Sequence, residues 1–252
     1  MKNMIKLNTL GASVAVGFGF FVVSAQAQVI SWNFDGYGTI NGGSDYAGVV
    51  SADYWNDTYQ IDGNSGAPES NLINNTGTAT TLSASFTDNS QYGYAIQFSG
   101  QSADSDGLYN KALLNGYLNN GNGASVDIAL TGIPYSAYSI YVYLSSDTAG
   151  RDGTVNVGST TFDFSTIGPA EISGSNALFT QTADTTGADP AADYAVFTGL
   201  SGASQTIIST IPSYGGIAGF QIVDTAPVPE AGTLALTAFG GVSLLLLGRK
   251  KS

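Results

Sequence analysis

The 252-residue sequence contains no cysteine and no histidine, and charged residues make up only 10% of it. Without histidine, the chain cannot carry a Ser-His-Asp or Cys-His catalytic set, and it lacks the commonest metal ligand. Without cysteine, it forms no disulfides, so its fold must be held by a hydrophobic core alone. These absences exclude several large classes of enzyme and metal site.

Basic residues are also scarce, and most of them lie near the two ends of the chain. The sequence has 7 Lys and Arg against 19 Asp and Glu, a formal net charge of −12. Only Lys111 and Arg151 lie between the terminal segments, where nearly all of the carboxylates are found. Because so acidic a surface repels phosphate groups, we expect no nucleic-acid partner. Acidic polysaccharides are poor partners for the same reason, unless divalent cations bridge them.

Residues 1–27 have the layout of a secretory signal peptide. A basic n-region precedes an apolar h-region at residues 10–23. Ala25 and Ala27 then supply the small side chains that signal peptidase requires, which predicts cleavage before Gln28. An uncleaved N-terminal anchor is the alternative.

A second hydrophobic segment lies near the C-terminus. The run from Ala231 to Gly248 is uncharged and mostly apolar, and as a helix it would extend about 27 Å, at the lower edge of what spans a bilayer. The basic cluster after it is typical of a cytoplasmic flank. We predict that residues 231–252 form a transmembrane helix and a basic tail. The alternative, a buried C-terminal helix of a soluble domain, would require a polar face that this run lacks.

The same segment combines a short dipeptide, the apolar run and a basic cluster, and the residues concerned are Pro229, Glu230, Arg249, Lys250 and Lys251. This combination resembles the PEP-CTERM sorting tail of exported bacterial proteins. The resemblance implies that an exosortase-type membrane enzyme processes the tail and releases or re-anchors the body at the cell surface. Ala231 stands where the name-giving motif has a second proline. The likeness concerns delivery of the protein and not its activity.

The body between these segments has about 200 residues, enough for one domain with a substantial core. Short runs of alternating apolar and polar residues recur in it between turn signals, which is typical of strands. The expected strands are 29–34, 82–86, 92–98, 126–130, 139–144, 154–157, 160–164, 194–197, 205–211 and 217–223. The run 139–144 is apolar on both faces and is expected to be central, and Gly158-Ser159 is expected to form a hairpin turn. The helix candidate is 108–118, in which Gly116 is unfavourable.

About ten short strands predict an all-β fold at residues 28–224, a two-sheet sandwich of jelly-roll type flanked by the signal helix and the transmembrane helix. Residues 225–230 then form a linker and sorting motif, because Pro227 and Pro229 cannot continue a sheet.

The body also carries a looser likeness in the order of its motifs. Trp55-Asn56 is followed by Leu-Thr-Gly-Ile-Pro at 130–134, by Tyr-Ala-Val-Phe at 194–197 and by Gly-Phe-Gln-Ile-Val at 219–223. This order is similar to that of the galactose-binding-type sandwiches found ahead of PEP-CTERM tails, and it implies the same fold.

Calcium is the one cofactor that the sequence suggests. Asp104 and Asp106 offer two carboxylates two residues apart, and Gly107 permits a tight turn after them. The third ligand and the terminal glutamate of an EF-hand are missing. The alternative is a pair of solvated turn aspartates that accept hydrogen bonds from their own backbone.

Aromatic residues suggest a second kind of site. Tyr54, Trp55 and Tyr59 lie close together in a polar stretch with Asn56 and Asp57. Flat rings beside amide and carboxylate acceptors stack on sugar faces and bind their hydroxyls, so this stretch is a candidate carbohydrate site. The alternative is that Trp55 fills the core, with its indole N–H bonded to a carbonyl.

Glycoside hydrolysis needs only two carboxylates, so a polysaccharide-active enzyme stays formally possible. Glu69 and Glu171 are the only glutamates of the body, and no sequence feature predicts that they face each other. We expect a non-enzymatic protein.

We therefore predict an exported β-sandwich of the bacterial envelope, anchored through its C-terminal helix or released at the cell surface after processing. Its expected role is structural or adhesive, at the surface or in the extracellular matrix. Its expected partners are signal peptidase, an exosortase-type enzyme, the membrane and an extracellular polysaccharide. A carbohydrate-binding module is the alternative, followed by a polysaccharide-active enzyme.

Overall fold

The computed structural model describes residues 27–34, 40, 43–57, 69–87, 93–95, 103–119, 125–177, 179–211 and 213–226. They belong to one compact unit, Ala27–Pro227. The predicted signal peptide up to residue 26, and the predicted sorting motif and transmembrane helix from residue 227 onward, lie outside the described residues.

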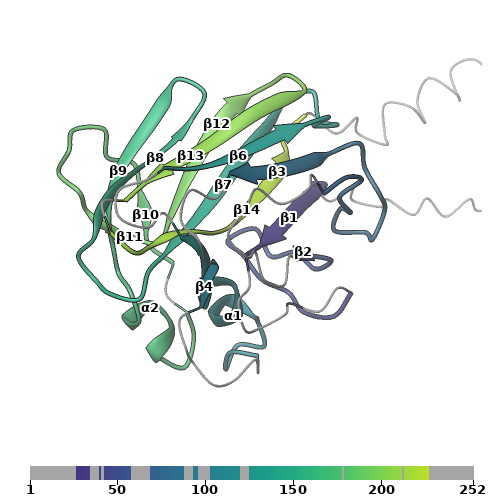
Figure 1. Cartoon of the computed structure of the whole chain (residues 1–252). Helices are drawn as coiled ribbons and strands as arrows, with labels where there is room; N and C mark the ends of the chain where they lie inside the picture. The colour runs from purple at the N-terminus through teal and green to yellow at the C-terminus, as the bar shows by residue number, and fades with distance from the viewer. Residues whose placement is uncertain are drawn as a thin grey trace, which may run out of the picture. The chain divides into compact units, whose positions relative to one another are not determined.

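Within the described residues the strands form two sheets, of eight and six strands (Figure 1). The larger sheet has the order β10-β12-β7-β14-β1-β2, with β5 also paired to β14 and β4 paired to β5. Its strands are β1 (Val29–Asn33), β2 (Asn56–Asp57), β4 (Gly93–Ala95), β5 (Gly116–Asn119), β7 (Tyr138–Ser145), β10 (Gln181–Thr182), β12 (Tyr194–Leu200) and β14 (Gly216–Asp224).

The smaller sheet has the order β11-β9-β8-β13-β6-β3. Its strands are β3 (Ser83–Thr87), β6 (Ser125–Thr131), β8 (Asp152–Val157), β9 (Thr160–Thr166), β11 (Ala191–Ala192) and β13 (Ser204–Thr210). Long neighbours pair antiparallel, whereas the two-residue strands β2, β10 and β11 add parallel pairs at the margins. Two short helices, α1 (Asn110–Leu114) and α2 (Ala170–Ser173), complete the described elements.

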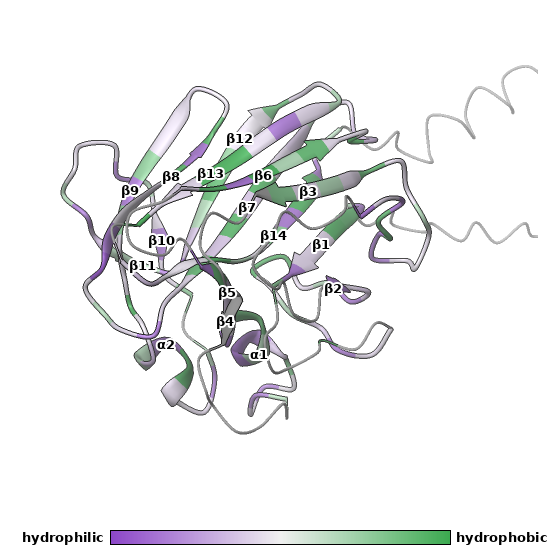
Figure 2. Cartoon of the chain, in the orientation of Figure 1, coloured by the Kyte–Doolittle hydropathy of each residue, from purple (hydrophilic) through white to green (hydrophobic). Residues whose placement is uncertain are grey.

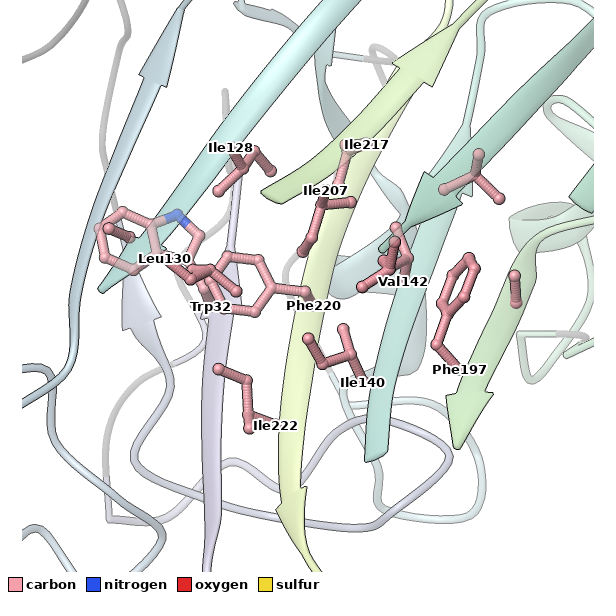
Figure 3. Packing of buried hydrophobic residues seen from close by; sticks show 14 of the residues in the cluster. Trp32, Ile128, Leu130, Ile140, Val142, Phe197, Ile207, Ile217, Phe220 and Ile222 are labelled. Carbon is pink, nitrogen blue, oxygen red and sulfur yellow. The ribbon is translucent and has the colours of Figure 1, made fainter. Parts of the chain in front are cut away.

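The inner faces of the two sheets pack against each other, so the fold is an all-β sandwich as the sequence predicts. Alternate residues along β6 are buried, and Figure 2 shows the hydropathy of the strands. The main hydrophobic cluster joins Trp32, Ile140 and Phe220 of the larger sheet to Ile128 and Ile207 of the smaller one (Figure 3). Burial of these side chains is the chief stabilising contribution.

The run 139–144, which was expected to be a central strand, lies in β7 and is central. β7 lies between β12 and β14, and β14 lies between β7 and β1. Both are buried on two faces, because α1, α2 and the loop 43–55 cover the outer face of the larger sheet. This cover creates a second hydrophobic cluster that includes Trp55, Leu113, Tyr143 and Ile172.

Two local predictions have different outcomes. The β8–β9 hairpin is confirmed, since Val157 pairs with Thr160 and Gly158 takes the positive φ of 63° that its tight turn requires. The helix expected at 108–118 is wrong in extent. α1 ends at Leu114, and from Gly116 the chain continues as β5, whose pairing with β4 and β14 outweighs a helix propensity that glycine already weakens.

Candidate functional site

Trp55, the central residue of the candidate carbohydrate site, is buried. Its side chain is 4% exposed, and its indole N–H donates to the Ala52 carbonyl at 2.9 Å. The ring belongs to the second hydrophobic cluster and lies 6.3 Å from the ring of Tyr143. In this position the indole offers no open face to a sugar, which matches the core alternative.

The neighbours of Trp55 also make structural contacts. Tyr54 has a positive φ of 53°, and its ring lies against Gly77, where an added Cβ would stand 2.8 Å from the ring carbon Cε1. The Asn56 amide donates to the carbonyls of Ser31 and Ile73 at 2.9 Å, and its oxygen accepts from the Ile73 N–H at 2.9 Å. These bonds join the loop to β1. Tyr59 and the side chain of Asp57 lie outside the described residues.

The candidate calcium ligands are tied to backbone groups. The Ala177 N–H donates to Asp104 Oδ2 at 3.0 Å, and the Leu108 N–H donates to Asp106 Oδ1 at 3.0 Å. Burial raises the pKa of Asp104, although the backbone N–H groups of Ala177 and Lys111 and the charge of Lys111 oppose that effect. In the described part of the chain, no three acidic side chains are arranged so that they could hold a metal ion. Asp106 thus accepts from its own turn, as the alternative expects, whereas Asp104 is buried and joins the turn to a distant segment.

The sequence did not single out a buried polar network on the covered face of the larger sheet. The Tyr143 hydroxyl donates to Gln221 Oε1 at 2.5 Å and accepts from the Val49 N–H at 2.8 Å. Gln221 Nε2 donates to Ser31 Oγ at 3.1 Å and to the Val50 carbonyl at 2.8 Å. Burial raises the pKa of the Tyr143 hydroxyl well above its usual value, so the group keeps its proton and acts as the donor. The network fastens the loop containing Val49 and Val50 to three strands.

Replacing Tyr143 by phenylalanine is expected to lower the free energy of unfolding by about 1–3 kcal/mol, because Gln221 Oε1 and the Val49 N–H each lose a buried partner. Urea denaturation measures this loss. The matched control is Tyr46→Phe, which removes the same hydroxyl from a side chain that is 46% exposed and should change stability by less than about 0.5 kcal/mol. Equal effects of the two substitutions would contradict the role given to the network.

Two acidic side chains are buried under the same cover. Ser145 Oγ donates to Glu171 Oε1 at 2.6 Å, and the Thr180 N–H donates to Asp193 Oδ1 at 2.7 Å. Both side chains are 0% exposed, and the second oxygen of each carboxyl has no partner among the described residues. No local sequence motif predicts this pair, because Glu171 lies in α2 and Asp193 lies just before β12, and the two segments meet only in the folded chain.

Burial shifts both carboxyls toward the neutral form. It raises the pKa of Asp193 to about 7, against the opposing effect of the Thr180 N–H. It raises the pKa of Glu171 well above the usual range, and the charge of nearby Asp193 raises it further. Neutral, buried acids of this kind could serve as general acids, but full burial separates them from any substrate. Glu69, by contrast, is exposed and pairs with Ala84 beside the smaller sheet, in the other layer of the sandwich.

Of the two basic residues in the described part of the chain, Arg151 is held by contacts within the protein. Arg151 forms an ion pair with Asp147 at 2.9 Å, donates to Ser213, and lies 5.7 Å from the ring centre of Tyr214. Neither Arg151 nor Lys111 has another basic side chain beside it in the sequence or in a described contact, so no basic patch forms on the described unit.

A shallow depression of about 420 Å³ lies on the outer face of the smaller sheet. Strands β6, β8 and β13 contribute its lining, which includes Ala129, Thr131, Asn156, Thr206 and Ile208. Its volume falls in the range of small-ligand sites. The sequence analysis did not find it, because its residues come from three strands and none carries reactive chemistry.

Among the described residues, no helix is both long enough and apolar enough to cross a membrane.

The comparisons with known proteins yield no family for the chain. No protein-family model matches the chain, and a search of curated proteins gives no match.

Proposed function

We propose that the chain is an exported bacterial protein of the cell surface or extracellular matrix, with a structural or adhesive role. A PEP-CTERM-type tail would sort it and hold it at the membrane. The observation that carries the proposal is the extent of the folded unit, Ala27–Pro227. That unit coincides closely with the body left between the signal cleavage site before Gln28 and the sorting dipeptide at Pro229.

The character of the folded unit supports a structural rather than a catalytic role. Its buried acids, Glu171 and Asp193, are covered, and its aromatic rings around Trp55 and Tyr143 pack in a hydrophobic cluster. The described cations Lys111 and Arg151 are too few to bind polyanions. We propose a jelly-roll-like sandwich, with an N-terminal signal helix and a C-terminal transmembrane helix outside it.

Fractionation and intact mass of the full-length chain, expressed in a bacterium that has an exosortase-type enzyme, test this proposal. We expect a mature N-terminus at Gln28 and recovery from the envelope. Deleting residues 231–252 should shift the protein almost entirely to the soluble exported fraction, because the membrane segment is lost.

Replacing Pro229 and Glu230 together by alanine is the companion experiment. This double variant should stay in the membrane at full C-terminal length, because the helix is intact while the sorting motif is gone. Recovery of the unclipped parent chain from the cytosol would overturn the proposal. Unchanged processing of the double variant would overturn the assignment of the motif alone.

A further inference from the structure

The depression on the smaller sheet arises from a mismatch in strand length. β13 pairs with β6 over Ser204–Thr210, but it pairs with β8 only over Ile207–Thr210, since β8 ends and turns at Gly158. Ser204 to Thr206 therefore have a strand on one side and the tip of the β8–β9 hairpin on the other (Figure 1). The depression lies at this place, where β8 stops before the end of β13.

The lining combines an apolar floor with neutral polar groups. Ala129 and Ile208 supply aliphatic surface, while the exposed residues Thr131, Ser204 and Thr206 supply hydroxyls. These residues face outward, because Leu130 on β6 and Ile207 on β13, which alternate with them, are buried in the core. None of the lining residues is charged, although the whole chain carries a net charge of −12.

Two amide side chains at the rim are held in place by the protein. Asn156 Nδ2 donates to the Thr160 carbonyl at 2.8 Å and to Thr161 Oγ1 at 2.9 Å. Gln205 Nε2 donates to the Tyr138 hydroxyl at 3.1 Å and to the Ser201 carbonyl at 3.2 Å. With their NH₂ groups bound, both amides keep their oxygens as fixed acceptors, so a ligand with hydroxyl donors meets a partly preorganised site.

We propose that this depression binds a segment of a neutral polysaccharide. The aliphatic floor, the hydroxyls and the amide acceptors match the C–H faces and hydroxyls of a sugar, and the lining has no cationic side chain to attract a phosphate or a uronate. The inference deepens the proposed function, on which it rests, because an exported domain at the cell surface meets extracellular polysaccharides. No aromatic ring lines the site, so we expect a single sugar unit to bind weakly. A polymer offers many such units to the same protein, which raises the overall affinity.

Affinity gel electrophoresis tests the inference with the full-length chain in a detergent that has no sugar headgroup. The probes are dextran, amylose and a β-1,3-glucan, with alginate as the charged comparison. We expect at least one neutral polymer to retard the protein. Thr206→Arg, which places a long side chain in the depression, should weaken that retardation about tenfold or abolish it.

The matched control is Thr210→Arg, which adds the same side chain to the same outer face of β13, outside the lining. It should behave like the parent chain. Thr131→Arg fills the depression from β6 and replaces Thr206→Arg if that variant does not fold. Absence of retardation by every neutral probe, or equal retardation of parent, Thr206→Arg and Thr131→Arg, overturns the inference. The assay uses purified protein, so its result does not depend on where the protein is found in the cell. Polysaccharide binding can therefore be absent while fractionation supports export, and binding can be present while fractionation contradicts export.

Discussion

Replacing Trp32 by alanine is expected to lower the free energy of unfolding by about 3–5 kcal/mol, the range for large aromatic residues in a core. Trp32 is 1% exposed and lies in β1. Its ring is stacked on Phe220 (Figure 3), with centroids 6.3 Å apart and planes 6° from parallel. It also meets Phe86 edge-on, with centroids 6.4 Å apart. Removing the ring opens a cavity in the core, where the larger sheet packs against the smaller one.

Trp32→Phe is the matched control for this experiment. The indole N–H of Trp32 is buried and has no partner among the described residues, so phenylalanine removes no hydrogen bond and keeps an aromatic ring against Phe220. We expect a cost well below that of the alanine variant. Urea denaturation followed by tryptophan and tyrosine fluorescence, with circular dichroism as a second probe, measures both. An alanine variant as stable as the parent chain would place Trp32 outside the core.

Raising the pH from about 4 to above 7 is expected to destabilise the fold through Asp193. In the unfolded chain this carboxyl ionises near 3.8, whereas burial in the fold raises its pKa to about 7. Between these two values the unfolded state loses its proton while the folded state keeps it, so stability falls as pH rises. The difference between the two pKa values corresponds to about 4 kcal/mol.

Asp193→Asn should remove this component, because asparagine cannot ionise and its oxygen can still accept from the Thr180 N–H. The measurement is the free energy of unfolding of each protein at several pH values between 4 and 9. Asp152→Asn is the control, since it removes one negative charge from an exposed position. Parallel curves for all three proteins would show that Asp193 titrates as an exposed carboxyl does.

Glu171→Gln extends the same experiment. Burial, and after it the charge of nearby Asp193, raise the pKa of the Glu171 carboxyl well above its usual range, although the Ser145 hydroxyl opposes them. The variant should therefore reduce the loss of stability with rising pH, while the Ser145 hydroxyl keeps an oxygen to bind. The direction of both effects opposes the usual acid denaturation, in which paired carboxylates are lost as pH falls.

The strands of this fold were largely predictable from the sequence. Alternation at Val126, Ile128 and Leu130 marks one buried face, and the doubly apolar run at 139–144 marks a strand covered on both sides. These patterns follow from side-chain geometry within a single strand, so they need no knowledge of the neighbours. The two-residue strands β2, β10 and β11 leave no such pattern and were missed.

The candidate sites were less predictable, because each depends on contacts between distant segments. Tyr143 and Gln221 are 78 residues apart, and nothing near either residue reveals that they form a hydrogen bond. Trp55 has the neighbours of a sugar-binding residue in sequence, but it lies in the covering loop and packs into the second hydrophobic cluster. The depression depends on where β8 ends relative to β13, which is a property of register and not of composition.

The position of β14 in the larger sheet also determines when this protein can fold. This last strand of the unit pairs with β1, the first, from Val29 opposite Val223 to Asn33 opposite Gly219, and with β7 on its other side. Until residues 216–224 emerge from the ribosome, the sheet lacks the strand that joins its two halves, and β1 has no long partner. Such distant pairing makes folding slow and late. Nearly the whole folded unit must therefore be synthesised before the larger sheet can close.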